Sequence, residues 1–431
     1  MDPFEYLLSL EKFGIKFGLQ NIQTLIGALD HPDHAFRSVL IAGTNGKGSV
    51  TAMVDRALRS AGVRVGRYTS PHLIRLEERF AVNGETIPAG TLADLIEQLR
   101  RVVDTLLATG ALEHPPTFFE VTTALALEWF RRARVELAVL EVGLGGRLDA
   151  TNVVDPVAAA ITSIDFDHEQ YLGTTLAAIA GEKAGVVRPG IPIVIGPMTP
   201  EARGAIAEAC ARAGAELVEA DRGAVVQTTA EDGRTSVRLA TPARDYGWIP
   251  LGLRGEHQAT NAVVAVRLLE RLEGILPVMP EAIIAGLRDV RWPGRLQMIA
   301  NQDGKMVLLD AAHNPAGAWT LAAYLRREFP EPIPIVFGAM RDKDVALMLK
   351  TLLPVAARLV ATQPVMARAM PAAEVAAIAR RLASGALIEI EPDPRQALAR
   401  AWTHCPVVCA AGSIFLVGAL LDELGPSARE L

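Results

Sequence analysis

Residues 38–62 read Ser-Val-Leu-Ile-Ala-Gly-Thr-Asn-Gly-Lys-Gly-Ser-Val-Thr-Ala-Met-Val-Asp-Arg-Ala-Leu-Arg-Ser-Ala-Gly, and this stretch decides the fold. It predicts a strand, a glycine loop and a helix in succession. The apolar run Val39–Ala42 is typical of a buried parallel strand. Apolar side chains then recur at helical spacing until Gly62, which is expected to end the helix. The glycines between strand and helix would let a ligand approach the backbone closely.

The loop at residues 43–49 has the composition of a phosphate-binding loop. Amides at a helix N-terminus together with Lys47 favour phosphate, and the Ser49 hydroxyl is placed to reach a magnesium ion. The spacing departs from the common pattern G-x-x-x-x-G-K-[ST] in two ways. The first glycine, Gly43, is closer to the lysine in the sequence, and Gly48 separates the lysine from the serine. A glycine turn without a ligand is the simpler alternative, but the order of the parts favours binding of a nucleoside triphosphate.

The composition excludes several classes of protein. The chain has 431 residues, of which 50% are hydrophobic, enough for two domains with their own cores. A net charge of −6 argues against general binding of nucleic acid. No apolar run is long enough to cross a bilayer, and the first residues lack the pattern of a secretory signal. Three cysteines, few and odd in number, fit a reducing compartment. We therefore expect a cytoplasmic protein with neither a nucleic acid nor a membrane as its partner. We also expect it to be a monomer.

Two α/β units are predicted along the chain. In the first, the expected strands are 63–69, 136–141, 158–164 and 191–196, and the expected helices include 92–107, 117–132, 174–184, 201–213 and 255–272. Pro293-Gly294 breaks the chain, so the domain boundary is placed between residues 295 and 296. Strands of the second unit are expected at 306–309, 333–337, 359–362, 387–390 and 406–410. The predicted fold class is α/β, with a P-loop NTPase-like parallel-sheet domain at 1–295 and a smaller Rossmann-like domain at 296–431. A ligand cleft is expected between them.

Polar residues follow several of the predicted strands. They are Ser70, His72, Glu141, Asp165, Asp167, His168, Asp310 and His313. Singly, each has a structural alternative as a solvated strand end or a turn residue, and Lys183 near a helix C-terminus is favoured there simply as a cation. Together with the phosphate loop they could gather one or two magnesium ions and serve phosphoryl transfer. The residues alone do not identify the phosphoryl acceptor.

Several motifs, in the right order over nearly the whole chain, resemble one family. The most specific is the stretch at residues 141–152, Glu-Val-Gly-Leu-Gly-Gly-Arg-Leu-Asp-Ala-Thr-Asn. Others are residues 43–49, 69–73, 167–168 with 172–173, 182–185, 257–258 with 261, 293–295, 310–315 and 338–344. They resemble folylpolyglutamate synthase, which in bacteria is often bifunctional with dihydrofolate synthase and belongs to the Mur ligase superfamily. Gln297 departs from the many relatives that carry Glu at this position.

The resemblance implies an ATP-dependent amide ligase. A carboxylate of dihydropteroate or of a reduced folate would attack the γ-phosphate of ATP, giving an acyl phosphate and ADP. The amine of L-glutamate would then attack the acyl carbon and release phosphate. A Mur-type ligase acting on a cell-wall precursor is an alternative, for which the roughly forty residues before the loop are expected to be too few to form the extra domain. A non-catalytic nucleotide-binding module is the other alternative. One sequence does not separate the two folate activities.

The resemblance also implies a set of site residues. ATP would be bound by Gly43, Thr44, Asn45, Gly46, Lys47, Gly48, Ser49, Asn261, Arg295, Asp310 and His313. Magnesium, at two sites, would be held by Ser49, Ser70, Glu141, His168 and Lys183, the lysine being carbamylated. Lys47, His168 and Lys183 are the expected catalytic residues. The folate or dihydropteroate would lie against Phe17–Ile22 and against Thr117, Phe118, Phe119, Glu120, Leu148, Asp149 and Ala150.

Overall fold

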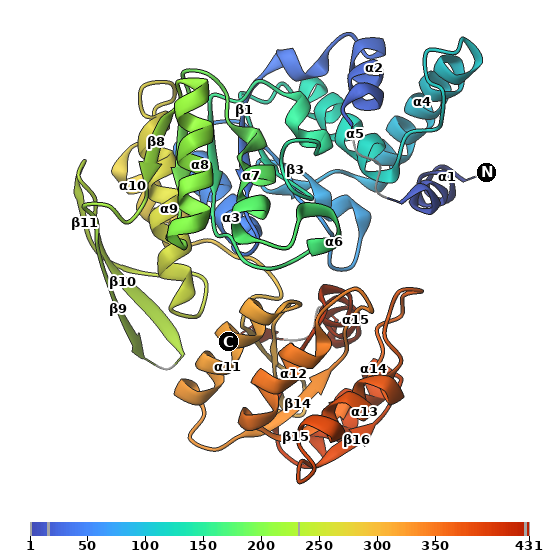
Figure 1. The fold of residues 1–431 in the computed structure, drawn as a ribbon, viewed down its shortest axis with the longest axis vertical. Helices are drawn as coiled ribbons and strands as arrows, with labels where there is room; N and C mark the ends of the chain where they lie inside the picture. Colours follow the sequence, from blue (N-terminus) through green and yellow to red (C-terminus); the bar gives the residue numbers. More distant parts are fainter. Residues whose placement is uncertain (1, 15–17, 232, 426–428, 431) are drawn as a thin grey trace.

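The computed structural model describes residues 2–14, 18–231, 233–425 and 429–430. Figure 1 shows two α/β units, blue to yellow above and orange to red below, with a small separate sheet beside them. The first unit is built on an eight-stranded sheet and the second on a seven-stranded sheet. The predicted α/β fold class with two parallel-sheet units is therefore confirmed. None of the helices in the described ranges is long and apolar enough to cross a membrane.

The phosphate loop follows a central strand of the first sheet. The strand order is β4-β3-β2-β5-β1-β6-β7-β8. The strands are β1 Arg37–Ala42, β2 Val65–Tyr68, β3 Phe80–Val82, β4 Glu85–Thr86, β5 Leu137–Glu141, β6 Ala158–Ile161, β7 Pro192–Ile195 and β8 Glu216–Glu219. β1 pairs in parallel with β5 and with β6, and β2 pairs in parallel with β5. Because their carboxyl ends meet at one edge of the sheet, the loops after these strands converge there.

Helices cover both faces of this sheet. They are α1 Pro3–Ser9, α2 Gln20–Ala28, α3 Lys47–Ser60, α4 Ala89–Ala108, α5 Phe118–Arg132, α6 Glu169–Leu172, α7 Leu176–Lys183, α8 Pro200–Ala213, α9 His257–Leu272 and α10 Pro280–Arg288. One face packs against α2, α4, α5, α7 and α8, and the other against α3, α9 and α10. The predicted helix after the phosphate loop is α3, which buries Val50, Met53 and Leu58 completely. Its predicted end before Gly62 is confirmed, and Thr117 and Glu120 form a capping box at the start of α5.

Short 3₁₀ turns complete the connections of the first unit. They are η1 Leu10–Phe13, η2 Pro32–Ala35, η3 Leu76–Arg79, η4 Ala150–Val153 and η5 Ala184–Val186. Asn83 and Gly84 form the turn of a hairpin between β3 and β4, and both turn residues have positive φ, 51° and 85°. The strand predicted at 158–164 is too long, because β6 ends at Ile161. The next residues turn instead toward the phosphate loop, where Ser163 Oγ accepts a hydrogen bond from the backbone amide of Asn45.

The second unit has the strand order β16-β15-β14-β17-β13-β12-β18. Its strands are β12 Gln297–Ala300, β13 Met306–Leu309, β14 Ile333–Phe337, β15 Ala356–Ala361, β16 Ile388–Ile390, β17 Val407–Ala411 and β18 Arg429–Glu430. Its helices are α11 Pro315–Glu328, α12 Val345–Leu352, α13 Ala372–Leu382, α14 Pro394–Trp402 and α15 Ile414–Leu424, with the 3₁₀ turn η6 Leu353–Val355. All five predicted strands are present. The antiparallel strands β12 and β18 were not predicted.

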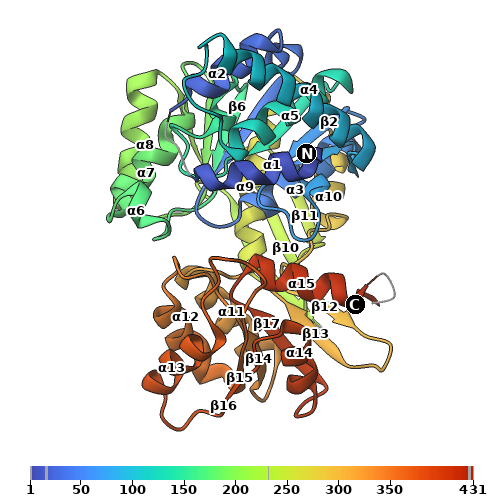
Figure 2. The same ribbon diagram turned by 90° about the vertical axis from the view of Figure 1, so that its right-hand side faces the viewer.

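A third, antiparallel sheet is formed by β9 Val225–Glu231, β10 Arg234–Ala240 and β11 Asp245–Pro250. Val237, Leu239 and Ile249 face inward and join the core formed by α3, α9 and α10. In Figures 1 and 2 this sheet extends from the first unit down toward the second.

The two units meet closely at α15, which faces the first unit in Figure 2. A Cβ atom on Gly418 of α15 would lie 2.0 Å from the carbonyl oxygen of Leu73, in the loop after β2. A Cβ atom on Gly294 would lie 3.0 Å from Val417 and 3.5 Å from Leu73. The chain connection and α15 therefore both pack against this one loop of the first unit.

Candidate functional site

A cleft of about 1970 Å³ lies at the carboxyl edge of the first sheet and is lined by residues of both units. All of the residues predicted individually for ATP, metal and substrate line it. They are Gly43, Thr44, Asn45, Gly46, Lys47, Gly48, Ser49, Ser70, Thr117, Phe118, Phe119, Glu120, Glu141, Leu148, Asp149, Ala150, His168, Lys183, Asn261, Arg295, Asp310 and His313. Of the predicted substrate segment 17–22, Gly18 lines the cleft, whereas Phe17 lies outside the described residues and Ile22 is buried in the core. That part of the substrate prediction is therefore reduced to one position.

The shape of the phosphate loop depends on its glycines. Gly43 and Gly46 have φ of 140° and 86°, which favours glycine at both positions. A Cβ atom would lie 2.0 Å from Thr162 Oγ1 at Gly43 and 2.4 Å from Asn261 Oδ1 at Gly46. The loop is thus packed against the segment after β6 and against the start of α9.

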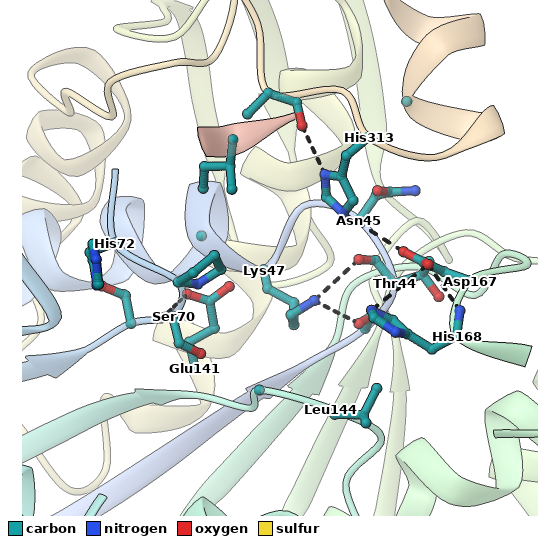
Figure 3. Close-up of a pocket in the computed structure, with 18 of the residues that line it drawn as sticks. Thr44, Asn45, Lys47, Ser70, His72, Glu141, Leu144, Asp167, His168 and His313 are labelled. Atoms are coloured by element: carbon teal, nitrogen blue, oxygen red, sulfur yellow. Dashed lines mark hydrogen bonds and ion pairs between the residues drawn. The ribbon is translucent and has the colours of Figure 1, made fainter. Parts of the chain in front are cut away.

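Lys47 lies at the centre of the cleft. Its ammonium group donates hydrogen bonds to the carbonyl oxygens of Gly43, at 3.1 Å, and Thr44, at 3.2 Å. Figure 3 shows its side chain between Glu141 on one side and Thr44 on the other. Burial lowers the pKa of Lys47, while the charge of Glu141 acts in the opposite direction. Among the described residues no carboxylate lies within ion-pair distance of this ammonium group, so it can still pair with an anion.

Glu141 and Ser49 supply oxygen atoms beside the lysine. The Glu141 carboxylate is buried at the end of β5 and accepts the amide of Ser70 at 3.2 Å. Burial raises the pKa of Glu141, and the Lys47 charge opposes that rise. Ser49 is buried in the first turn of α3. Carboxylate and hydroxyl oxygens are ligands that Mg²⁺ accepts, so this side of the cleft fits one magnesium ion.

A polar network on the other side of the cleft joins the two units. Asp167 Oδ1 lies 2.6 Å from Lys343 Nζ, and Asp167 Oδ2 accepts a hydrogen bond from the side-chain amide of Asn314 at 3.1 Å. Asn314 also donates to Asn45 Oδ1 at 3.0 Å, which ties the network to the phosphate loop. Burial acts to raise the pKa of Asp167, but the charge of Lys343 outweighs it and holds that pKa well below its usual value.

His168 lies at the edge of this network. Its Nε2 is 3.3 Å from Lys343 Nζ and 3.8 Å from Asp167 Oδ1. Burial lowers the pKa of His168 to about 4, although Asp167 acts in the opposite direction. The imidazole is therefore neutral near pH 7 and can offer a nitrogen lone pair. The sequence motifs contained Asp167 and Lys343, but nothing in their spacing showed that these two side chains would meet.

Lys183 points at the phosphate loop. It is the last residue of α7, which confirms its predicted position near a helix C-terminus. The residue is only 5% exposed. Its Nζ donates to the Gly43 carbonyl oxygen at 2.8 Å. Burial, and then the charge of Lys47, lower the pKa of Lys183 to about 7. Lys183 is therefore a buried side chain in contact with the phosphate loop, and its burial favours the neutral amine.

The predicted substrate residues are held in place by their own hydrogen bonds. Glu120 Oε2 accepts the Thr117 amide at 2.7 Å, in the capping box of α5. Asp149 Oδ2 accepts the amide of Leu144 at 2.8 Å, and its Oδ1 accepts the amide of Thr151 at 3.0 Å. These carboxylates therefore shape the wall of the cleft, whereas Phe118 and Phe119 offer it aromatic surface.

Arg79 is a lining residue that the sequence analysis missed. It is 7% exposed, its guanidinium carbon lies 5.0 Å from the centre of the Phe118 ring, and its Nε donates to His72 Nδ1 at 3.0 Å. No carboxylate in the described part of the chain forms an ion pair with it. A buried arginine needs a partner charge, so its position between the aromatic wall and Glu141 favours an anionic ligand. In the sequence it is a single arginine just before a hairpin, with no motif around it that indicates binding.

Three predicted residues line the cleft from the end of the first unit and from the second, namely Arg295, Asp310 and His313. The Asp310 carboxylate accepts the amides of Leu296 and Ala312, both at 2.9 Å. Burial raises the pKa of Asp310, opposed by Arg295. The His313 Nδ1 lies 2.8 Å from the Ala311 carbonyl oxygen and must donate to it, which leaves Nε2 as an acceptor. Burial lowers the pKa of His313 to about 4, so this tautomer stays neutral.

The sequence matches known families over most of its length. The Mur ligase middle domain matches residues 41–269, and the Mur ligase glutamate ligase domain matches residues 294–418. A Bacillus subtilis protein named dihydrofolate synthase/folylpolyglutamate synthase is 38% identical over 346 residues, 79% of this chain and 80% of the relative. A Halobacterium salinarum protein named probable bifunctional folylpolyglutamate synthase/dihydropteroate synthase is 38% identical over 424 residues. That match covers 96% of this chain and 50% of the relative, so the chain spans half of the longer protein.

Solved structures agree in fold over the whole chain. Mycobacterium tuberculosis folylpolyglutamate synthase complexed with ADP and AMPPCP has a TM-score of 0.92 at 33% identity, covering 99% of this chain and 100% of that one. A structure described as an FPGS-AMPPCP-folate complex has a TM-score of 0.84 at 30% identity, covering 99% and 100%. E. coli FolC in complex with DHPP and ADP has a TM-score of 0.83 at 28% identity, covering 98% of both chains.

Proposed function

Because this chain belongs to the Mur ligase family, among its dihydrofolate and folylpolyglutamate synthases, we propose that it is an ATP-dependent ligase adding L-glutamate to dihydropteroate, to reduced folates, or to both. One observation carries the proposal beyond family membership. A single cleft joins the phosphate loop, the buried Lys47, an oxygen-rich edge at Glu141 and a buried Arg79 that forms no ion pair with a described carboxylate. Such a cleft can hold a triphosphate beside a carboxylic acid.

The proposed reaction begins with the acid substrate. The pterin side packs against Phe118 and Phe119, and Arg79 holds a carboxylate of the acid. Lys47 and the amides at the start of α3 hold the phosphates of ATP, so that one carboxylate oxygen attacks the γ-phosphorus and ADP leaves. L-Glutamate then attacks the acyl carbon through its amine, the carbon–oxygen bond to phosphate breaks, and inorganic phosphate leaves. His313, with Arg295 and Asp310, closes the nucleotide side from the second unit.

Water has to be kept from the acyl phosphate between these two steps. The network of Asp167, Lys343, Asn314 and Asn45 links the units directly across the cleft. A closed arrangement of this kind excludes water and raises the strength of the charge interactions inside.

The residues present fit magnesium in part. Ser49, Ser70 and Glu141 would hold one ion, which when bound neutralises phosphate charge. A second ion at His168 and Lys183 needs an oxygen ligand in place of the lysine ammonium, since Mg²⁺ prefers oxygen. We propose that Lys183 is carbamylated, which converts its nitrogen into a carboxylate-bearing group. Support comes from its burial, its lowered pKa and its contact with Gly43 of the phosphate loop.

Further proposals concern the organisation of the protein. The boundary at residues 295–296 falls just before β12, the first strand in sequence of the seven-stranded sheet. We also propose that the protein is a monomer. A cytoplasmic location is supported by the few cysteines and by the intracellular supply of ATP and L-glutamate that the reaction needs.

Phosphate release with purified protein, ATP, Mg²⁺ and L-glutamate tests the proposed function. We expect release to depend on an acid substrate, with dihydropteroate and tetrahydrofolate compared separately. Mass spectrometry of the product should show the addition of one glutamate residue through an amide bond. Turnover with neither acid would contradict the ligase function, and turnover with one would assign the specificity.

Replacing Arg79 with methionine tests how the acid substrate is bound. Methionine keeps much of the packing on Phe118 but removes the charge, so we expect the KM of the acid substrate to rise about 10–100-fold while the KM of ATP changes little. Arg75→Met is the matched control, because Arg75 is exposed and lies just before the same 3₁₀ turn. An equal effect on both KM values, or none, would remove Arg79 from substrate binding.

A further inference from the structure

A second cluster of possible ligand groups lies away from the cleft, between α2 and β1. His31, Asp33 and His34 surround the 3₁₀ turn η2, and one ligand atom from each lies within 4.8 Å of the others. They precede β1, whereas the phosphate loop follows it, so the cluster is at the opposite edge of the sheet. None of the three lines the cleft, and neither the proposed reaction nor the family motifs give them a role.

The distances within the cluster suit a metal ion. His31 Nδ1 lies 3.6 Å from Asp33 Oδ1, and His34 Nε2 lies 3.3 Å from Asp33 Oδ2. Ligand atoms bonded to tetrahedral zinc at about 2.0–2.2 Å are about 3.3–3.6 Å apart. Each imidazole lies at about this spacing from the carboxylate, His31 from its Oδ1 and His34 from its Oδ2. Both spacings are also long for good hydrogen bonds between an imidazole and a carboxylate.

The carboxylate of Asp33 supplies an independent reason. Its side chain is 5% exposed, and Oδ1 is buried without any hydrogen-bond donor among the described residues. A buried carboxylate in this state needs a cation, because burial disfavours an isolated charge. Among the residues that the structure describes, the groups facing it in ion-pair range are the two imidazoles, which are metal ligands when neutral.

The local backbone also favours positive charge. The amide of His31 donates to the Ile26 carbonyl oxygen at 2.9 Å, directly at the C-terminal end of α2. Cations are stabilised at helix C-termini by the exposed carbonyl dipoles. The cluster therefore combines two imidazoles, a buried carboxylate and the negative end of a helix.

We propose that His31, Asp33 and His34 bind a divalent transition-metal ion such as Zn²⁺, with water completing the coordination. The two imidazole rings are nearly parallel, at 8° and with centroids 4.8 Å apart, so one ring must turn to bring a lone pair toward a shared ion. His34 can do so, because its side chain is 68% exposed. The ion would fasten the end of α2 to the segment that enters β1. Its role is structural, and ligase turnover does not require it.

Titration of the metal-stripped full-length protein with Zn²⁺ alone tests this site by calorimetry. Because His168 and His313 in the cleft offer other nitrogen ligands, the comparison is between variants. We expect the double variant His31→Ala, His34→Ala to bind one Zn²⁺ equivalent fewer than the unmodified protein, or to bind that equivalent about 100-fold more weakly. His114→Ala, at another exposed histidine, is the matched control and should titrate like the unmodified protein.

A spectroscopic measurement makes the assignment specific. Co²⁺ in place of Zn²⁺ should give ligand-field absorption that the double variant lacks and that His114→Ala retains. Zn²⁺ should also raise the thermal midpoint of the unmodified protein more than that of the double variant, with equal ligase activity in both. Identical titrations of the double variant and the unmodified protein would overturn the proposal, as would the absence of Zn²⁺ binding in the unmodified protein. Retained activity shows that each variant is folded.

Discussion

Lys47→Met is expected to lower kcat/KM for ATP by about 10³-fold or more and to abolish measurable nucleotide binding. The reason is the position of its ammonium group at the centre of the cleft. It is held by the carbonyl oxygens of Gly43 and Thr44 and has no carboxylate partner in the described chain, so a phosphate group is the charge it is placed to meet. Methionine preserves the length and the packing of the side chain but cannot carry that charge.

Two measurements follow this effect, one on nucleotide binding and one on turnover. Calorimetric titration with a non-hydrolysable ATP analogue reports binding, and phosphate release reports turnover. Lys350→Met is the matched control, since Lys350 is exposed on α12, and it should behave like the unmodified protein. A folded Lys47→Met protein that binds the analogue normally would contradict the role proposed for the phosphate loop.

Lys183→Ala is expected to lower turnover by about 10²–10³-fold with a smaller change in the binding of nucleotide. Lys183 Nζ lies 2.8 Å from the Gly43 carbonyl oxygen, so the alanine variant loses a group beside the phosphates. If the group is a carbamate, a small carboxylate such as acetate, diffusing into the space left by the side chain, should restore part of the activity. Restoration should be absent for Lys47→Met, because that variant lacks a cation.

The carbamate itself has a separate readout. Carbon dioxide reacts with a neutral amine, and the pKa of about 7 gives Lys183 a substantial neutral fraction at pH 7–8. As the pH falls below that pKa the ammonium form accumulates, so activity should decline and should respond to added bicarbonate mainly above pH 7. Mass spectrometry of the native protein should show carbon dioxide attached at Lys183. Full activity from a demonstrably unmodified lysine in bicarbonate buffer would remove the carbamate from the mechanism.

Much of the fold was predictable because its central strands are continuous apolar runs with clear breaks at their ends. The strands at 306–309 and 333–337 were predicted with the bounds that β13 and β14 have. β12 was missed because its four residues are mostly half-buried and show no clear alternation. β9 is not among the strands that the sequence predicted, since nearly all of its residues are exposed and it exists through pairing with β10.

The site was predictable where its residues sit at strand ends within a continuous motif, as Glu141 and the phosphate loop do. It was not predictable where two distant segments meet. Lys343 and Asp167 are separated by 176 positions, and only the packing of the two units brings their charges to 2.6 Å. Arg79 was missed for a different reason. Its significance is the absence of an ion-pair partner among the described residues, which a sequence does not display.

Gly418 carries a consequence for how this sequence can vary. The backbone of α15 approaches Leu73 so closely that a single methyl group would lie 2.0 Å from its carbonyl oxygen. The same loop begins with Ser70, whose amide donates to the Glu141 carboxylate. Glycine is thus the residue that fits at position 418, and a survey of tolerated substitutions should rank it beside Lys47 and Lys183 although it has no side chain to react.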